Sequence, residues 1–171
     1  MKMLSSIIEG KVKIIDVDDV DTDNIFHASL LTIHKPEEIK KHIFGNLSGY
    51  EKFSQKDHNG EILFVGKNFG KGSTRQQAVT GFLAHNIKII IGKSFAPIYY
   101  TNAINEGLLL IRAPLLNLSD FENGEQIIID IGKSKIVHFS TQIEITFEKI
   151  PPPVIDIINA GGLLELGKNN S

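Results

Sequence analysis

The chain has 171 residues, of which 42% are hydrophobic and 22% are charged, a composition typical of a folded globular domain and not of a disordered segment. Its 18 Lys and Arg residues against 20 Asp and Glu residues give a formal net charge of -2, which provides no overall attraction to nucleic acid or to an anionic membrane surface. The chain contains no Cys, which excludes a disulfide framework, a Cys-ligated zinc site, an iron–sulfur cluster bound by this chain and a cysteine nucleophile.

The hydropathy pattern predicts neither a membrane anchor nor a secretory signal. No apolar run approaches the ~20 residues that a membrane helix needs. The first residues lack the long apolar core and the small-residue cleavage site of a signal peptide. Because the sequence also has no repeat and no long linker, we expect a cytoplasmic protein that forms a single α/β domain over residues 1–171.

The first half of the chain predicts two strands and one helix. Residues 11–15 alternate and are β-branched, as in a strand, and the acidic stretch that follows predicts a loop. Residues 35–44 begin with Pro and two Glu and carry Lys toward their end, an order that favours a surface helix. Residues 61–65 are a short apolar run beside glycines, which predicts a buried strand.

The middle of the chain alternates between helix and strand, and the last third changes to short strands. The spacing predicts helices over 74–85 and 94–105, each followed by a strand, over 87–91 and 108–111. This order implies a βαβα core. Three further strands, expected as a β-meander, are 126–131, 135–139 and 142–147. An apolar helix over about 154–159 should end at Gly161-Gly162.

The segment 66–78, with the sequence GKNFGKGSTRQQA, lies between a predicted strand and a predicted helix. Glycines let the backbone approach a ligand, and the first N–H groups of a helix have no internal partner, so such a segment attracts anions. Arg75 lies within the first turn of the expected helix, where it can hold a carboxylate or a phosphate through two parallel hydrogen bonds.

Three other interpretations of this segment compete. The spacing of Gly66, Gly70 and Lys71 departs at two places from that of a nucleotide P-loop. The dinucleotide fingerprint is half present, because Arg75 stands where the third glycine is needed. The remaining alternative is that Ser73 or Thr74 caps the helix, since a Gln follows each at the spacing of a capping box.

Four ordered blocks of the sequence resemble the small subunit, or swivel domain, of the aconitase and isopropylmalate isomerase superfamily. The first, DDVDTDNI at 18–25, is similar to the acidic Asp-Thr-Asp turn of the family. The second, NFGKGSTRQQA at 68–78, is similar to the family's Asn-Phe-Gly-Cys-Gly-Ser-Ser-Arg-Glu-His-Ala. The others lie at 93–108 and 158–165, so the resemblance covers nearly the whole chain.

The resemblance implies an aconitase-type swivelling β/β/α domain that supplies part of an active site to a larger, cysteine-bearing subunit in a heterodimer or heterotetramer. That subunit would carry a [4Fe-4S] cluster whose iron acts as a Lewis acid on the leaving hydroxyl. Ser73 matches the family's catalytic base, which removes a proton from carbon beside a carboxylate. Arg75 matches its carboxylate-binding arginine. The helix N-terminus and Arg75 would both favour a charged serine oxygen.

The resemblance also suggests roles for residues around this pair. Asp23 matches an acidic position that orients neighbouring groups, although aspartate also caps turns for purely local reasons. We expect Gly72 and Thr74 to line the substrate site beside Ser73. The segment 24–33 matches the loop that selects the side group of the substrate, where Leu30, Leu31 and Thr32 would form an apolar wall with one hydroxyl, suited to an alkyl group.

Several positions depart from the family pattern. Ser29 stands where many members have Arg, His27-Ala28 where they have Pro-Gly, and Lys71, Gln76 and Gln77 replace Cys, Glu and His. The implied activity is that of a hydro-lyase subunit for small hydroxy-dicarboxylates or tricarboxylates, with isopropylmalate of leucine biosynthesis as the best single substrate. Homoaconitate or a methylated malate are alternatives, as is a non-catalytic anion-binding module.

The other polar and aromatic candidates indicate structure more than chemistry. No two of the six histidines have the spacing of metal ligands on one helix, so we expect no metal site in this chain and most histidines at the surface or an interface. Phe95, Tyr99 and Tyr100 are expected in the core or at a subunit contact, because no basic stripe accompanies them.

Overall fold

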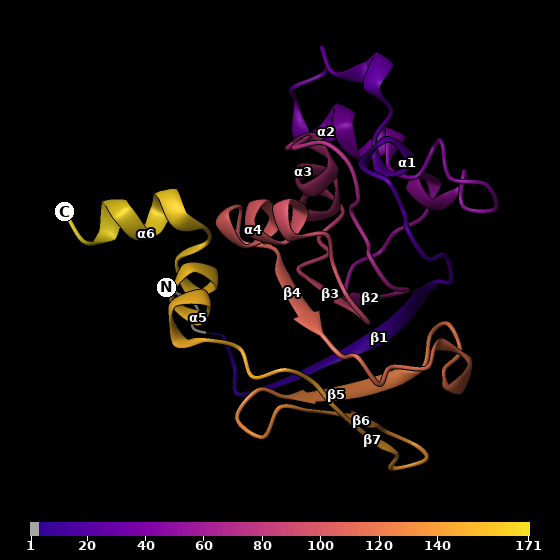
Figure 1. The fold of residues 1–171 in the computed structure, drawn as a ribbon, viewed down its shortest axis with the longest axis vertical. Coiled ribbons are helices and arrows are strands. Elements are labelled where there is room, and N and C mark those ends of the chain that lie inside the picture. Colours follow the sequence, from indigo (N-terminus) through magenta and orange to yellow (C-terminus); the bar gives the residue numbers. More distant parts are fainter. Residues whose placement is uncertain (1–3) are drawn as a thin grey trace.

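The computed structural model describes residues 4–171 and shows a curled seven-stranded sheet with helices packed on it (Figure 1). The strand order is β4-β3-β2-β1-β5-β6-β7. The strands are β1 (Ile7–Ile15), β2 (Glu61–Val65), β3 (Ile89–Gly92), β4 (Leu109–Arg112), β5 (Gln126–Asp130), β6 (Lys135–His138) and β7 (Glu144–Thr146). The helices are α1 (Thr22–Ile25), α2 (Pro36–Ile39), α3 (Gln77–Ala84), α4 (Pro97–Asn105), α5 (Pro152–Ala160) and α6 (Leu163–Asn169).

Strands β1 to β4 are parallel and form the half of the sheet that is covered on both faces. In β2, Leu63 and Val65 pack into one hydrophobic core, together with α3, while Ile62 and Phe64 pack into a second core against which α5 lies. A strand that is buried on both faces has a continuous apolar sequence. This is why residues 61–65 were recognisable as a strand, and the βαβα prediction is confirmed.

Strands β5, β6 and β7 are antiparallel neighbours, which confirms the predicted meander. It joins the parallel half through β1, which pairs with β2 on one side and with β5 on the other. In Figure 1 this meander lies at the bottom of the molecule, away from α1, α2 and α3. The loops that follow β1 and β2 lead to α1 and to α3, in the helical part of the molecule.

Three predicted helices are shorter in the structure than the sequence predicts. The expected helix 94–105 begins only at Pro97. The expected helix 35–44 is α2 followed by a 3-10 turn at Lys40–His42, because Ile39, Ile43 and Phe44 all turn into the core. The expected helix 74–85 begins only at Gln77. Residues before it are held by contacts with the acidic loop, described below.

The end of the chain also differs from the prediction. Helix α5 ends as expected at Gly161, whose φ of +88° places it in the left-handed region. A further helix, α6, follows it and was not predicted; in Figure 1 it extends away from the sheet. Within residues 4–171, no helix has both the length and the apolarity needed to cross a membrane.

Half of the six histidines, most of which were expected at the surface or an interface, are buried within the chain. They are His58, His85 and His138. Each has a partner that sequence spacing does not reveal: His58 bonds Glu61 and the Phe53 carbonyl, His85 the Lys40 carbonyl, and His138 the Glu125 carboxylate. Burial of a polar ring is tolerated when its nitrogens are hydrogen-bonded.

Candidate active site

The acidic loop after β1 and the glycine-rich loop after β2 lie against each other and are joined by backbone hydrogen bonds. The Val20 carbonyl accepts from the N–H groups of Gly70 (2.8 Å) and Lys71 (3.1 Å), and the Thr22 N–H donates to the Lys71 carbonyl (2.7 Å). These contacts bridge ~50 residues of sequence, and parallel neighbouring strands make them possible because they end at the same edge of a sheet. The two sequence blocks of the resemblance therefore form one structural unit.

Two glycines allow this close approach. Gly70 has a φ of +85°, and a Cβ atom there would lie 2.2 Å from Cγ of the buried Tyr99. Gly72 has a φ of +105°, and a Cβ atom there would lie 3.0 Å from the Asp21 carboxylate. Both φ values lie in the region that favours glycine, so these two positions fix the path of the loop toward Ser73.

The short helix α1 aims Thr22 and Asp23 at the glycine-rich loop. Asp21 is its N-cap and accepts a hydrogen bond from the Asp23 N–H (2.8 Å), and the Asn24 side chain accepts one from the Asp21 N–H (3.0 Å). Asp21 and Asn24 thus form a reciprocal capping box. The alternative that Ser73 or Thr74 caps α3 is wrong, because Gln76 is the N-cap of that helix and makes no side-chain cap bond.

Ser73 lies on the exposed tip of the glycine-rich loop and contacts the buried Thr22. The Ser73 N–H donates to Thr22 Oγ1 at 3.2 Å, and the two hydroxyl oxygens are 3.3 Å apart. Either hydroxyl of this pair can be the donor; in the arrangement in which the Thr22 hydroxyl donates, it favours a negative charge on Ser73 Oγ. Thr22 was not among the predicted site residues, although it stands at the centre of the Asp-Thr-Asp block.

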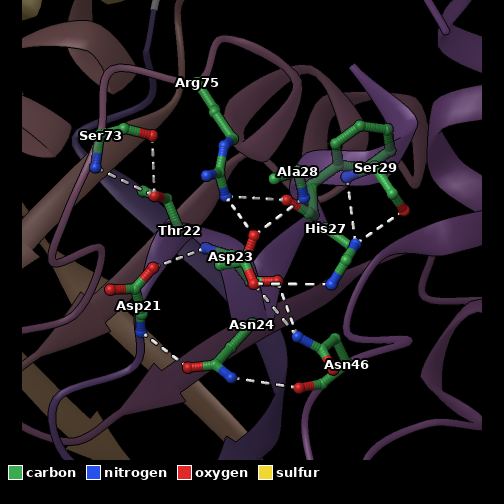
Figure 2. A network of polar contacts seen from close by, with 11 residues as sticks. Asp21, Thr22, Asp23, Asn24, His27, Ala28, Ser29, Asn46, Ser73 and Arg75 are labelled. Carbon is green, nitrogen blue, oxygen red and sulfur yellow. Dashed lines mark hydrogen bonds and ion pairs between the residues drawn. The ribbon is translucent and has the colours of Figure 1, made fainter. Parts of the chain in front are cut away.

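Arg75 reaches back from the glycine-rich loop to the acidic loop. Its Nη1 donates to Asp23 Oδ1 at 2.8 Å and to the Phe26 carbonyl at 3.3 Å. Both of its hydrogen bonds within residues 4–171 use Nη1, which leaves Nε and Nη2 for a ligand. Figure 2 shows the side chains of Ser73 and Arg75 converging on the Thr22–Asp23 segment.

The Asp23 carboxylate is the meeting point of the network in Figure 2. Besides Arg75, it accepts a hydrogen bond from the Ala28 N–H at 2.8 Å, and its second oxygen lies 3.4 Å from Asn46 Nδ2 and 3.8 Å from His27 Nε2. The hydrogen bond from the Ala28 N–H, with smaller contributions from His27 and Arg75, holds the pKa of Asp23 below its ordinary value. Asp23 is thus an ionised residue that orients Arg75.

The segment 24–33, expected to select the side group of the substrate, includes Asp23's neighbours in the sequence and ends before α2. Leu30 is half-buried against the core, whereas Leu31 is 40% exposed and Thr32 is exposed. The segment is also tied to α3, because Gln77 Nε2 donates to the Leu31 carbonyl at 3.2 Å and to the Ile33 carbonyl at 3.4 Å. Leu31 is therefore the apolar side chain of the expected wall that remains available to a ligand.

The electrostatic support expected from a helix N-terminus does not apply at Ser73. Helix α3 begins four residues later, and the macrodipole acts over the first turn only. Arg75 likewise precedes the helix. Gly72 and Thr74 are exposed on either side of Ser73, so the loop places all three residues together.

The remaining candidates have structural surroundings. Phe95 and Tyr99 are core residues, as expected, and the Tyr100 ring stacks on the Arg112 guanidinium at 3.9 Å. Asp18 and Asp19 of the acidic stretch bond the Lys67 N–H and the Asn68 side chain. In the part of the chain from 4 to 171, no three His, Asp or Glu side chains gather into a metal-binding group.

Comparison with known proteins gives consistent matches. The sequence profile of the aconitase C-terminal domain matches residues 6–115. The 3-isopropylmalate dehydratase small subunit of Aquifex aeolicus is 37% identical over 151 residues, covering 88% of this chain and 89% of the relative. The methanogen homoaconitase small subunit of Methanocaldococcus jannaschii is 38% identical over 147 residues, covering 86% of this chain and 84% of the relative.

The fold is also similar to that of a solved structure. The crystal structure of a 3-isopropylmalate dehydratase from Methanocaldococcus jannaschii has a TM-score of 0.85 and 36% identity, covering 96% of this chain and 95% of that one. The aconitase-type α/β fold expected from the sequence is thereby confirmed.

Proposed function

Because this chain belongs to the aconitase C-terminal domain family, we propose that it is the small subunit of a heteromeric hydro-lyase that interconverts 2- and 3-isopropylmalate by dehydration and rehydration. The observation that carries the proposal is the convergence of the Ser73 hydroxyl and the Asp23-bound Arg75 on one edge of the sheet. One group suits proton transfer and the other suits carboxylate binding. The proposed unit is the whole of residues 1–171, acting as a single swivel domain.

Arg75 binds a carboxylate of the substrate in this proposal. Asp23 fixes the guanidinium through Nη1, so Nε and Nη2 present two parallel donors. The ionised Asp23 also offsets part of the arginine charge, so that a bound carboxylate completes a network of opposite charges. Arg75 thereby holds the reacting carbon at a fixed place relative to Ser73.

Ser73 acts as the base. Its deprotonated oxygen takes the proton from the carbon beside the bound carboxylate, hydroxide leaves the adjacent carbon, and an alkene remains; rehydration with the opposite regiochemistry gives the isomer. The Thr22 hydroxyl, 3.3 Å away, supports the charged oxygen. The Ser73 N–H is fixed on Thr22 Oγ1, which holds the serine in place during turnover.

We assign the [4Fe-4S] cluster of the complex to the large subunit. The chain has no Cys, and no set of His, Asp or Glu ligands gathers between residues 4 and 171, so the residues present do not fit the cluster. The proposed partner is therefore a cysteine-bearing large subunit, in a heterodimer or heterotetramer located in the cytoplasm. The steps above belong to this chain's own residues.

The side group of the substrate contacts Leu31. An exposed leucine on the loop beside Arg75 suits a branched alkyl group, which favours isopropylmalate. The homoaconitase small subunit, at 38% identity, supports homoaconitate as the second candidate, and the exposed Thr32 hydroxyl offers a hydrogen bond to its longer acid chain. Methylmalate-type acids, with a smaller alkyl group, are the third.

The test is hydro-lyase activity of this chain mixed anaerobically with its cluster-bearing large subunit. Alkene formation is followed from isopropylmalate, homocitrate and methylmalates. We expect turnover of isopropylmalate that is lost in Ser73→Ala and retained in the control Ser119→Ala. Ser119 is an exposed serine, distant in sequence from Ser73, whose hydroxyl donates to the side chain of Asn117. A complex that forms but turns over none of these acids refutes the proposal and favours a non-catalytic anion-binding module.

A further inference from the structure

The loop at residues 28–33 is held at its start by the side chain of His27. His27 Nδ1 accepts a hydrogen bond from the Ser29 N–H at 3.1 Å and lies 2.7 Å from Ser29 Oγ, so His27 caps the 3-10 turn Ala28–Leu30. An Nδ1 that accepts a hydrogen bond places the proton of the neutral ring on Nε2. That nitrogen faces Asp23 Oδ2 at 3.8 Å.

The same end of the loop is bonded to the group that orients Arg75. The Ala28 N–H and Arg75 Nη1 both donate, at 2.8 Å, to Asp23 Oδ1. His27 approaches the other oxygen of that carboxylate, as Figure 2 shows. The position of the loop start is thus coupled to the position of the guanidinium.

The far end of the loop is held by Gln77, the first residue of α3. Its side-chain amide donates to the carbonyls of Leu31 and Ile33, on either side of Thr32. The next two residues of α3, Ala78 and Val79, are fully buried, so this amide extends from a fixed part of the core. Leu31 therefore lies between two side-chain anchors.

Resting on the function proposed above, we propose that His27 and Gln77 are positioning residues for substrate selection, which hold the loop 28–33 so that Leu31 keeps a fixed place relative to Arg75. An apolar wall discriminates between side groups only if it does not give way to the wrong one, and a loop that is already ordered loses little entropy on binding. Neither residue needs to touch the substrate for this role.

Matched variants separate the two anchors from general damage. Gln77→Ala removes the donor, and Gln77→Glu keeps the size but places a carboxylate against two carbonyl oxygens. The control is Gln76→Ala, because the neighbouring amide bonds Glu106 and not the loop. His27→Ala removes the cap, whereas His27→Asn retains a side chain that caps well. His34→Ala controls for loss of an exposed histidine.

The first measurement is hydrogen exchange of the free full-length chain, read by mass spectrometry on peptides that span the loop 28–33. We expect exchange ~10-fold faster in Gln77→Ala, Gln77→Glu and His27→Ala, because Gln77 makes two hydrogen bonds to the loop and His27 accepts one from the Ser29 N–H. His27→Asn and both controls should resemble the unmodified chain. Unchanged exchange in Gln77→Ala and His27→Ala overturns the proposed anchoring.

The second measurement is the ratio of kcat/KM for isopropylmalate to that for methylmalate, in the complex with the large subunit. We expect this ratio to fall ~5–10-fold in the anchor variants, which is within the range that a hydrophobic pocket achieves. The change should appear in KM, while kcat stays nearly constant. Faster exchange with an unchanged ratio overturns the role in selection. If the unmodified complex is inactive, the proposed function is refuted, and the role in selection is refuted with it. The hydrogen-exchange measurement then still tests whether His27 and Gln77 anchor the loop.

Discussion

Replacing Thr22 tests whether its hydroxyl supports the proposed base. Thr22→Val keeps the size and the β-branched shape of this buried side chain but removes the oxygen that lies 3.2 Å from the Ser73 nitrogen and 3.3 Å from Ser73 Oγ. Removing one donor from a developing negative charge costs ~100-fold in enzymes with a fixed oxyanion donor. Because the contact here is long, we expect a fall in kcat of ~10–100-fold, equivalent to ~1.4–2.7 kcal/mol.

The effect on folding should be smaller than the effect on rate. Ser73 is exposed, so water replaces Thr22 as the partner of its N–H group, and the free energy of unfolding should fall by only ~1 kcal/mol. The assay is steady-state alkene formation in the complex, together with urea unfolding of the chain. Thr22→Ser, which keeps the hydroxyl and loses a methyl group, is the matched control. If kcat of Thr22→Val stays within a factor of ~2 of that of Thr22→Ser, the hydroxyl plays no part in proton removal.

Three further changes have definite expected outcomes. Arg75→Lys keeps the charge but loses the paired donors, so KM should rise ~10–100-fold in steady-state kinetics; an unchanged KM would place the substrate carboxylate elsewhere. Gly70→Ala drives a Cβ atom into the Tyr99 ring at a φ of +85° and should lower the free energy of unfolding by at least ~2 kcal/mol, measured by urea denaturation. Burial lowers the pKa of His85 in the folded chain below its ordinary 6.5, so the unfolded chain binds the proton first. The free energy of unfolding should therefore decline as pH falls through 6.5, and it should decline less in His85→Gln. Equal dependence on pH in the two proteins would refute this prediction.

The sheet was predictable from the sequence because its strands have local signatures. Residues 61–65 are apolar throughout, as a parallel strand covered on both faces must be, and the structure places β2 over the same residues. The meander was equally visible, because turn residues separate its strands. The order of the strands was not visible, since nothing local shows that β1 lies between β2 and β5.

The start of α3 was mispredicted because long-range contacts override a local signal. The Ser73-x-x-Gln76 pattern favours a cap, but the Lys71 carbonyl bonds the Thr22 N–H and Arg75 bonds Asp23, which hold the chain outside helical geometry until Gln76. Similar reasoning applies to His58, whose partners Glu61 and the Phe53 carbonyl become apparent only in the folded chain.

The candidate site shows the same division between local and long-range information. Ser73, Arg75 and Asp23 were named on a resemblance between sequence blocks. The structure joins Arg75 to the Asp23 carboxylate and places Ser73 against the neighbouring Thr22. Asp23 accepts from Arg75 and from the Ala28 N–H with the same oxygen, so the guanidinium that would bind the substrate and the loop that would select it share one anchor. A change in the loop must therefore move or reorient Arg75, and a ligand on Arg75 must act on the loop. In the proposed selection mechanism, the departures from the family pattern at residues 27–29 lie at this shared anchor, whereas Ser73, Arg75 and Asp23 keep the residue types of the family pattern.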